Sequence, residues 1–557
     1  MVLNHQQDLF LQLNPSSNTI IVKLVTSFLI SFPLAALLKR IPDSRPEAKN
    51  LFAIGVSLFY LVGLFDLWDG IRTLLISAGG TYCIAKFLRT SPYMPWIGFA
   101  FTMGHMSISH IARQANNDPS TADVTGAQMV LLMKLSAFCW NVADGQLPEE
   151  QLSDFQKRNM LKEVPSLLDY AGWVFFFPAL FAGPSFDFAD YRRWLDTTMF
   201  DVSNVDPAKK PPTRKKRKIP RSGGPAAWKA ASGLFCIAMF MGLGGSYYPG
   251  LLTSDIYVKY GFLRRVWIMH MVSFTARLKY YGVWYLTEGS CILAGMGYNG
   301  VDPVTGKVFW NRLQNIDPWA VETAQNPRGY LGGWNINTSN WLRNYIYLRV
   351  TPRGKKPGFR ASLMTFGTSA LWHGFYPGYY LSFVLASLIQ TVAKSEFPWF
   401  RICIILTVTD FRRNVRPFFL NPVTSKPTTK KRYYDFASYL ATQLTFTFAT
   451  TPFLILEFQG SLLAWSRVYF YAVIWTVLSL IFFNSPGKSI LKKQLEERQG
   501  RASVKLEHSI STDSLSGKEP ILGISKDPES DISEAVEEIR AEMLMRQRKA
   551  KVNIESH

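Results

Sequence analysis

The chain has 557 residues, of which 48% are hydrophobic and 14% aromatic, and its formal net charge is +21 at pH 7. Soluble domains can reach this apolar fraction, but they rarely arrange it in repeated long runs. The runs therefore indicate a polytopic membrane protein. The excess of basic residues does not indicate nucleic-acid binding, because its densest clusters lie in loops between apolar runs, where basic residues commonly determine topology.

Apolar runs follow one another along most of the chain. They are Thr19–Leu38, Leu51–Phe65, Thr73–Phe87, Met94–Ile111, Leu167–Ala182, Ala230–Gly245, Val266–Arg277, Tyr281–Met296, Ser362–Trp372, Tyr376–Val392, Phe400–Val408, Phe436–Leu456 and Leu462–Phe483. Several are shorter than the roughly 20 residues that a bilayer crossing needs. We expect these to be re-entrant or buried by neighbouring helices, which predicts an all-α bundle of about eleven membrane helices.

The first run, Thr19–Leu38, is followed by Lys39 and Arg40 and has no basic stretch before it. A cleavable signal would show the opposite charge order. We therefore expect a retained helix whose C-terminal end faces the cytosol. Two basic loops, near residues 205–222 and 412–432, are expected to be cytosolic as well; attraction to anionic headgroups or to phosphate-bearing substrates is the alternative.

The composition changes near residue 484. Residues 1–483 form the predicted membrane-embedded domain, whereas residues 484–557 are polar, rich in Ser and Glu, and expected to be largely disordered. Ile532, Val536 and Ile539 recur at helical spacing in this tail. They predict a short amphipathic helix near residues 531–551 that binds a surface or a partner.

His373 has the most unusual surroundings of the seven histidines. A titratable ring at membrane depth is costly unless it is paired or faces water, so its default interpretation is functional. A neutral imidazole suits a general base. Its neighbours include glycines that permit close backbone approach, a proline that interrupts the helix, and aromatic residues that can line a pocket: Gly374, Gly378, Pro377, Trp372, Tyr376 and Tyr379. A purely structural histidine remains the alternative.

The other intramembrane histidines favour structural or channel-lining roles. His105 and His110 are five residues apart and do not share a helical face as an i, i+4 metal pair would. No nearby acid completes a metal site, so we expect no metal. His270, between large apolar residues, is expected to be a structural histidine of the bundle.

A second polar cluster spans Trp334–Tyr345, where Asn335 and Asn337 alternate with large apolar residues. Amide groups can orient an imidazole or stabilise an oxyanion. Two acids, Asp144 and Glu288, also lie in apolar sequence, where acids are usually paired or functional. A structural ion pair is the alternative for each.

Familiar catalytic patterns of other families are absent from the sequence. There is no G-x-S-x-G nucleophile elbow, no P-loop and no G-x-G-x-x-G fingerprint that follows a predicted strand. No histidine within the apolar segments is followed five positions later by Asp, which excludes the glycerolipid acyltransferases with a soluble-type domain.

The two remaining motifs carry a specific resemblance. Trp334-Asn335-Ile336-Asn337-Thr338, followed by Trp372-His373-Gly374-Phe375-Tyr376-Pro377-Gly378, resembles the membrane-bound O-acyltransferase family, in particular its lysophospholipid acyltransferase branch. The 38 residues between Asn335 and His373 are similar to that family's spacing. The resemblance runs from the first membrane helix to about Phe483.

The resemblance implies a bundle in the endoplasmic reticulum membrane with a central tunnel, a lumenal N-terminus and a cytosolic C-terminus. It implies His373 as the catalytic base and Asn335 as its amide partner. Asp144 and Glu288 resemble further required acids of this branch. The other motif residues are expected to support the site: Trp334, Asn337 and Trp372.

The function implied is transfer of an acyl chain from acyl-CoA to the free glycerol hydroxyl, mainly sn-2, of a lysophospholipid. Acyl-CoA is a co-substrate, and no bound cofactor, metal or nucleic acid is expected. Candidate substrate-binding residues are Arg343, Lys355 and Lys356 for the coenzyme A phosphates, with Tyr376 and Tyr379 in the pocket wall. The alternatives are another acceptor (a protein, a sterol or diacylglycerol) and a lipid transporter or scramblase.

Overall fold

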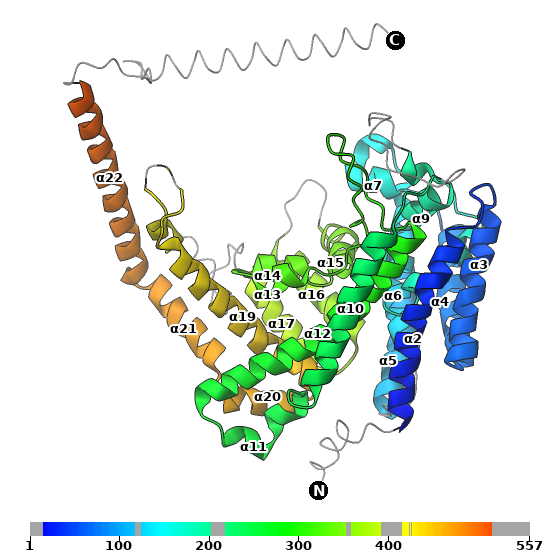
Figure 1. Cartoon of the computed structure of the whole chain (residues 1–557), viewed down its shortest axis with the longest axis horizontal. Coiled ribbons are helices and arrows are strands. Elements are labelled where there is room, and N and C mark those ends of the chain that lie inside the picture. The colour runs from blue at the N-terminus through cyan, green and yellow to red at the C-terminus, as the bar shows by residue number, and fades with distance from the viewer. Residues whose placement is uncertain are drawn as a thin grey trace. The chain divides into compact units, whose positions relative to one another are not determined.

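The computed structural model describes residues 15–116, 124–201, 218–351, 358–391 and 415–514, except residues 423 and 425. These residues form helices joined by loops (Figure 1). Within them, strand-like pairing is limited to two isolated bridges, Val301–Val308 and Leu420–Pro427. The expected all-α class is confirmed for the described part of the chain.

The elements before residue 260 combine long helices with short helical pieces. They are α2 (Pro15–Leu38), α3 (Pro46–Leu58), η1 (Phe59–Leu64), α4 (Trp68–Phe87), α5 (Met94–Asn116), α6 (Thr125–Asp144), η2 (Glu149–Gln151), α7 (Asp154–Asn159), α8 (Leu167–Val174), η3 (Phe177–Ala179), α9 (Phe188–Leu195), η4 (Thr198–Phe200), α10 (Gly223–Gly244), η6 (Pro249–Thr253) and α11 (Asp255–Val258).

After residue 260, a long helix is followed by four short elements and then by longer helices. They are α12 (Phe262–Ala294), α13 (Pro318–Glu322), α14 (Pro327–Gly333), α15 (Ile336–Leu342), η7 (Arg343–Tyr347), α16 (Phe359–His373), α17 (Pro377–Thr391), η9 (Arg416–Phe419), α19 (Lys431–Ile455), α20 (Phe458–Arg467), α21 (Tyr471–Asn484) and α22 (Pro486–Ser514).

Three segments within the described ranges are long and apolar enough to cross a membrane: Ile20–Leu38, Pro46–Leu64 and Gly223–Thr253. A fourth candidate is broken, because α20 and α21 meet at 71°. The remaining long helices carry polar residues that neighbouring helices bury, as in α6, where Gln128, Lys134 and Asp144 are buried. The count of eleven membrane helices therefore stays a prediction.

Two features of the helix pattern differ from the sequence prediction. Val266–Arg277 and Tyr281–Met296 were expected as separate runs, but α12 is one helix of 33 residues. It continues because Arg277, at the expected break, is buried and paired with Glu322. No apolar run predicted α6, since its buried polar residues interrupt the hydrophobic pattern. The predicted run Phe400–Val408 lies outside the described residues.

Contacts divide the chain into two compact units. The first comprises Met1–Arg416 and Thr429–Lys488, and the second Pro417–Thr428 and Ser489–His557. In the second unit, Arg498 of α22 donates hydrogen bonds to the carbonyls of Phe418 and Leu420.

Several predictions concern loops and a C-terminal tail that the structure describes only in part. The tail expected to be largely disordered begins with the 29-residue helix α22. Residues 515–557, including the helix predicted near 531–551, are not among those described, and neither is most of the basic loop near 205–222.

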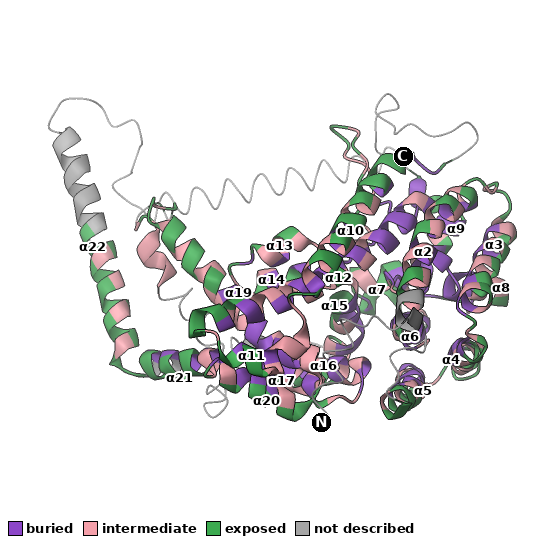
Figure 2. Ribbon diagram, turned by 60° about the horizontal axis from the view of Figure 1, so that its bottom comes forward, coloured by how far each residue is buried: buried purple, intermediate pink, exposed green. Residues whose placement is uncertain are grey.

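In the first unit, α12 is the central helix. It packs against α2, α10 and α19, while α5 packs against α6 and α16 against α17 (Figure 1). Buried residues gather between these helices, and exposed residues follow α10 and α21 (Figure 2). Apolar contacts form three clusters. The smallest of them joins α5 and α6 to α15, η7 and the end of α16, which brings the two sequence motifs onto one wall.

Candidate active site

His373 is the last residue of α16, at a sharp turn into α17 that starts at Pro377. Gly374 ends α16 with φ 118°, a region that favours glycine, and a Cβ there would lie 3.1 Å from His110 Nδ1. Gly378 donates to the carbonyl of Leu456 at 2.7 Å. The close backbone approach predicted for both glycines is confirmed.

Aromatic rings enclose the imidazole of His373. Its ring centroid lies 4.7 Å from that of Trp372, 5.5 Å from Tyr379, 5.1 Å from Phe383 and 4.9 Å from Phe453. The residue is half-buried, and no described side chain or backbone group hydrogen-bonds to its ring. Both ring nitrogens are thus left for a substrate, in surroundings that hold the ring by packing alone.

The backbone just before His373 is anchored to α5 and α6. Trp372 Nε1 donates to the carbonyl of Met129 at 3.0 Å, and His110 Nε2 donates to the carbonyl of Trp372 at 3.1 Å. The other two intramembrane histidines also have partners: His105 Nδ1 lies 2.8 Å from Ser77 Oγ, and His270 Nδ1 lies 3.0 Å from Thr447 Oγ1. These bonds agree with the structural roles expected for all three.

The two asparagines of the second motif differ in their surroundings. Asn337 Nδ2 donates to Asn315 Oδ1 at 3.1 Å and to the carbonyl of Leu313 at 3.3 Å, so its amide holds a neighbouring loop. Asn335 is the N-cap of α15, has φ 42°, and makes no side-chain cap hydrogen bond. Its half-buried amide is therefore the one that can turn to a ligand.

Two tryptophans fix the segment around Asn335. Trp334 packs edge-on against Trp284, with ring centroids 5.2 Å apart. Trp341 lies 6.2 Å from Trp372 and donates to Ser136 Oγ at 2.9 Å. The asparagine motif and the histidine motif are thus brought together through shared neighbours on α6.

Asp144 lies away from the aromatic enclosure of His373. It forms a bidentate ion pair with Arg349, with distances of 2.7 and 2.5 Å, and accepts a hydrogen bond from Gln156 Nε2 at 2.9 Å. This geometry fits the structural alternative, because it links the end of α6 to the chain that follows η7.

Glu288 also lies apart from His373, on α12. It is 1% exposed, and its Oε1 is 2.8 Å from Lys229 Nζ of α10. The expected roles of Asp144 and Glu288 as required, supporting acids stay predictions.

The predicted substrate-binding residues are only partly within the described structure. Arg343 is exposed and donates to Asn344 Oδ1 at 3.0 Å. Tyr379 lies edge-on to Tyr376, with ring centroids 6.1 Å apart, and both residues flank the turn after His373. Lys355 and Lys356 lie outside the described residues.

Sequence reasoning did not identify several residues of the site. Phe383 and Phe453 complete the enclosure of His373, and nothing in their local sequence distinguishes them from core residues. Tyr280 and Trp284 were identifiable, because they recur at four-residue intervals with the predicted acid Glu288 and so share one face of α12. Tyr280 and Trp284 form the wall behind Trp334.

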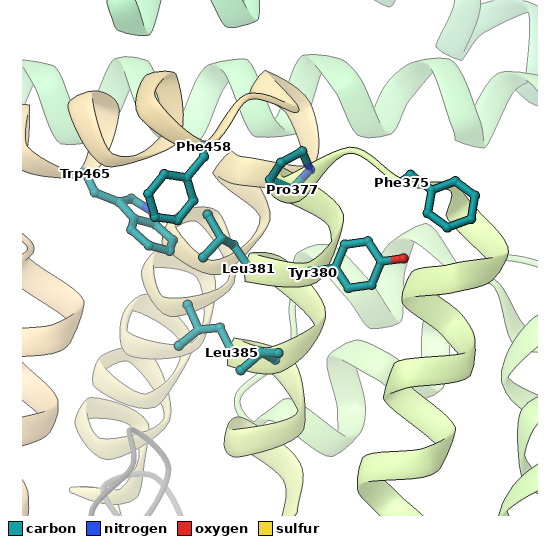
Figure 3. A pocket seen from close by; sticks show the side chains of 8 residues that line it. Phe375, Pro377, Tyr380, Leu381, Leu385, Phe458 and Trp465 are labelled. Carbon is teal, nitrogen blue, oxygen red and sulfur yellow. The ribbon is translucent and has the colours of Figure 1, made fainter. Parts of the chain in front are cut away.

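An apolar hollow of about 600 Å³ adjoins the turn that follows His373. Figure 3 shows Leu381, Leu385, Phe458 and Trp465 converging between α17 and α20, with Pro377 at the top. His373 itself does not line this hollow. A space of this size with almost entirely apolar walls can hold hydrocarbon but offers no group for chemistry.

The described ranges contain no group of three or more His, Cys, Asp or Glu side chains arranged to hold a metal ion. The site itself presents the imidazole of His373, the amide of Asn335 and apolar walls. Such a set can move a proton and stabilise an oxyanion while excluding water.

Comparison with known proteins identifies the same two motifs as part of a larger match. Residues 116–421 match the model of the membrane-bound O-acyltransferase family. A lysophospholipid acyltransferase of Schizosaccharomyces pombe is 43% identical over 484 residues, which cover 86% of this chain and 89% of the relative. A lysophospholipid acyltransferase of Saccharomyces cerevisiae is 42% identical over 501 residues, covering 87% and 78%. A human membrane-bound glycerophospholipid O-acyltransferase 1 is 29% identical over 448 residues, covering 79% and 83%.

Proposed function

The chain belongs to the membrane-bound O-acyltransferase family, and from that premise we propose that it transfers an acyl chain from acyl-CoA to the free glycerol hydroxyl, mainly sn-2, of a lysophospholipid. The observation that carries the proposal is the His373 imidazole, which is enclosed by aromatic rings and has no hydrogen-bond partner in the described structure. The names of the two fungal relatives support the choice of acceptor.

His373 acts as the general base in this proposal. Its neutral imidazole accepts the proton of the glycerol hydroxyl while that oxygen attacks the thioester carbonyl. The tetrahedral intermediate then expels the coenzyme A thiolate, and the imidazolium returns the proton to the sulfur. Base catalysis of this kind contributes a factor of about 10² to 10⁴ in rate.

Asn335 is proposed to serve as the amide partner, holding either the imidazole or the developing oxyanion. One oxyanion donor contributes roughly 3 kcal/mol to lowering the barrier. Its αL conformation supports this role, because it separates the side chain from the usual capping position of α15. Asn337 is the poorer candidate, since its amide nitrogen is already bound to the loop at Asn315.

The apolar surroundings protect the thioester from hydrolysis, which is the competing reaction. The rings of Phe383 and Phe453 hold water away from His373. The hollow between α17 and α20 gives hydrocarbon a place beside the turn after His373. No metal or bound cofactor is needed, because acyl-CoA arrives as an activated thioester.

We propose that Arg343, Lys355 and Lys356 bind the coenzyme A phosphates at the cytosolic entrance of the expected tunnel. Arg343 supports this, because it is exposed and lies eight residues after Asn335. Replacing these three by Gln should raise the KM for acyl-CoA severalfold while the KM for the lysophospholipid is unchanged. An unchanged KM for acyl-CoA would reject the assignment.

The wider setting follows from the family. We expect a bundle of about eleven helices with a central tunnel in the endoplasmic reticulum membrane, a lumenal N-terminus and a cytosolic C-terminus. The three apolar segments long enough to span support a multi-pass arrangement.

One assay tests the function directly and separates it from the alternatives. Purified protein in lipid nanodiscs should convert labelled acyl-CoA and a lysophospholipid into a diacyl phospholipid. Product formation with a sterol, a diacylglycerol or a peptide acceptor, and none with any lysophospholipid, would instead assign one of the other acceptors. Lipid movement without acyl transfer would indicate a transporter.

A further inference from the structure

His110 of α5 contacts the backbone on both sides of His373. Its Nε2 lies 3.1 Å from the carbonyl oxygen of Trp372, the residue before His373, across 262 residues of sequence. Its Nδ1 lies 3.1 Å from the position that a Cβ on Gly374, the residue after His373, would occupy. His110 itself is only 6% exposed. One buried side chain from a distant helix therefore touches both neighbours of the proposed base.

The contact with Trp372 caps the end of α16. The last carbonyls of a helix have no partner within it and need a donor from elsewhere. The backbone N–H of Gly374 donates to the carbonyls of Ala370 and Leu371, and the next carbonyl, that of Trp372, accepts from His110. A carbonyl oxygen can only accept, so Nε2 of His110 carries a proton in this bond. The C-terminal cap of α16 is thus completed by a side chain of α5.

The position of the His373 imidazole depends on this backbone. The ring is packed among aromatic rings, including those of Phe383 and Phe453, and no group in the described part of the chain hydrogen-bonds to it. The Trp372 carbonyl belongs to the planar peptide unit that ends at the Cα of His373. A donor that fixes this oxygen therefore fixes the orientation of the plane from which the imidazole projects.

The other contacts of this region act differently. Trp372 Nε1 donates to the carbonyl of Met129 on α6 at 3.0 Å, which holds the indole ring. Rotatable side-chain bonds separate that ring from the peptide plane, whereas the bond from His110 acts on the backbone itself. His105, on the same helix as His110, is bonded instead to Ser77 of α4. It offers an internal control, a buried hydrogen bond of a histidine of α5 that leads away from His373.

We propose that His110 is a positioning residue for acyl transfer: its bond to the Trp372 carbonyl sets the reach of the His373 imidazole toward the acceptor hydroxyl. The inference rests on the proposed function and adds a residue that acts through His373. A displacement of about 1 Å at a reacting group can cost roughly 10²-fold in rate. Loss of this bond should therefore slow the chemical step and leave substrate binding unchanged.

A matched pair of substitutions isolates the bond. Gln and Met have side chains of the same length and similar shape, but only Gln carries an N–H donor at the reach of the histidine Nε2. The assay is single-turnover acyl transfer by full-length protein in nanodiscs, with saturating acyl-CoA and lysophospholipid. His110→Met should lower the rate constant by about 10- to 100-fold. His110→Gln should stay within about threefold of wild type, with KM for both substrates unchanged in each variant.

The two parameters of a single turnover distinguish positioning from folding. The rate constant is a property of each folded molecule, whereas the amplitude counts the folded molecules. A histidine with a purely structural role would lower the amplitude at an unchanged rate constant, which is the result expected for the control His105→Met. If His110→Met gives too little amplitude to fit, His110→Asn replaces it. The shorter amide does not reach the Trp372 carbonyl, and the same fall is expected.

A double variant tests whether His110 acts through His373. In protein that already carries His373→Ala, His110→Met should cause no further fall in the rate constant, because the base that it positions is gone.

The inference would be overturned by a rate constant for His110→Met within about threefold of wild type, by a His110→Gln variant as slow as His110→Met, or by an equal fall in His105→Met. A further fall in the His373→Ala background would also overturn it. Failure of the wild-type protein to acylate any lysophospholipid would instead refute the proposed function.

Discussion

Asp144 and Arg349 form a bidentate ion pair, with Nη1–Oδ1 and Nη2–Oδ2 distances of 2.7 and 2.5 Å, in which Asp144 is 2% and Arg349 12% exposed. The pair joins the C-terminal end of α6 to the chain just after η7. Since α15 and η7 run continuously from Asn335, this ion pair helps to fix the segment that carries the proposed amide partner.

Breaking this pair should destabilise the fold. Arg349→Met leaves the Asp144 carboxylate buried without its cation, which costs on the order of 3 kcal/mol in the free energy of unfolding. Thermal unfolding of the detergent-solubilised protein measures the effect. The double variant Asp144→Asn/Arg349→Met should recover part of the loss, whereas Lys162→Met, which breaks the exposed pair with Glu149, should leave the melting temperature unchanged. A double variant no more stable than Arg349→Met would contradict the pairing.

The two asparagines should respond differently to substitution. Asn335→Gly removes the amide but suits φ 42°, so acyl transfer should fall by about 10² or more while the melting temperature is maintained. Asn337→Ala should lower the melting temperature instead, because the side-chain amide no longer donates to Asn315 Oδ1 and to the carbonyl of Leu313. Full activity in Asn335→Gly would reject its role at the reacting centre.

Asp187 should give the stability a specific pH dependence. It accepts hydrogen bonds from Tyr345 at 2.7 Å and Asn141 at 3.1 Å, in the loop before α9. Burial raises the pKa of its carboxyl to about 6, although these hydrogen bonds oppose the change. The folded state thus binds the proton more tightly than the unfolded state, and stability falls as the pH rises from about 4 to about 6.

Across this pH range the free energy of unfolding should fall by on the order of 2 kcal/mol because of Asp187. The pKa difference alone would give roughly 3 kcal/mol, and the partial exposure of the residue to solvent lowers this value. Asp187→Asn should lack this component. The difference in melting temperature between variant and wild type, followed from pH 4.5 to 7.5, should grow in favour of the variant up to about pH 6 and then stay level. A difference independent of pH would contradict the raised pKa.

The sequence predicts backbone features well where they depend on only a few neighbouring residues. The turn after His373 follows from Gly374, Pro377 and Gly378, whose backbone constraints act over a few residues. The αL conformation of Asn335 has a weaker local signal, because asparagine tolerates this region better than most residues but does not require it.

The partners of buried charges could not be predicted, since they come from distant segments. Asp144 meets Arg349 across 205 residues, and Arg277 meets Glu322 across 45. Within the described residues Lys134 meets no acid; it donates to the carbonyl of Trp173 and lies over the Trp173 and Phe186 rings. Hydrophobic periodicity does not indicate such contacts. The apolar pattern therefore did not predict helix α6, whose buried polar residues interrupt it.

The measurement that tests the account most directly is single-turnover acyl transfer by His373→Ala in nanodiscs, beside wild type and the control His270→Ala. His270 bonds to Thr447 on another helix and takes no part in the proposed reaction. We expect His373→Ala to elute as a folded protein on gel filtration and to lose acyl transfer by a factor of about 10² to 10⁴, while His270→Ala keeps turnover of the same order as wild type. Acyl transfer by His373→Ala within about threefold of wild type, well short of that factor, would contradict the role of His373 as the base.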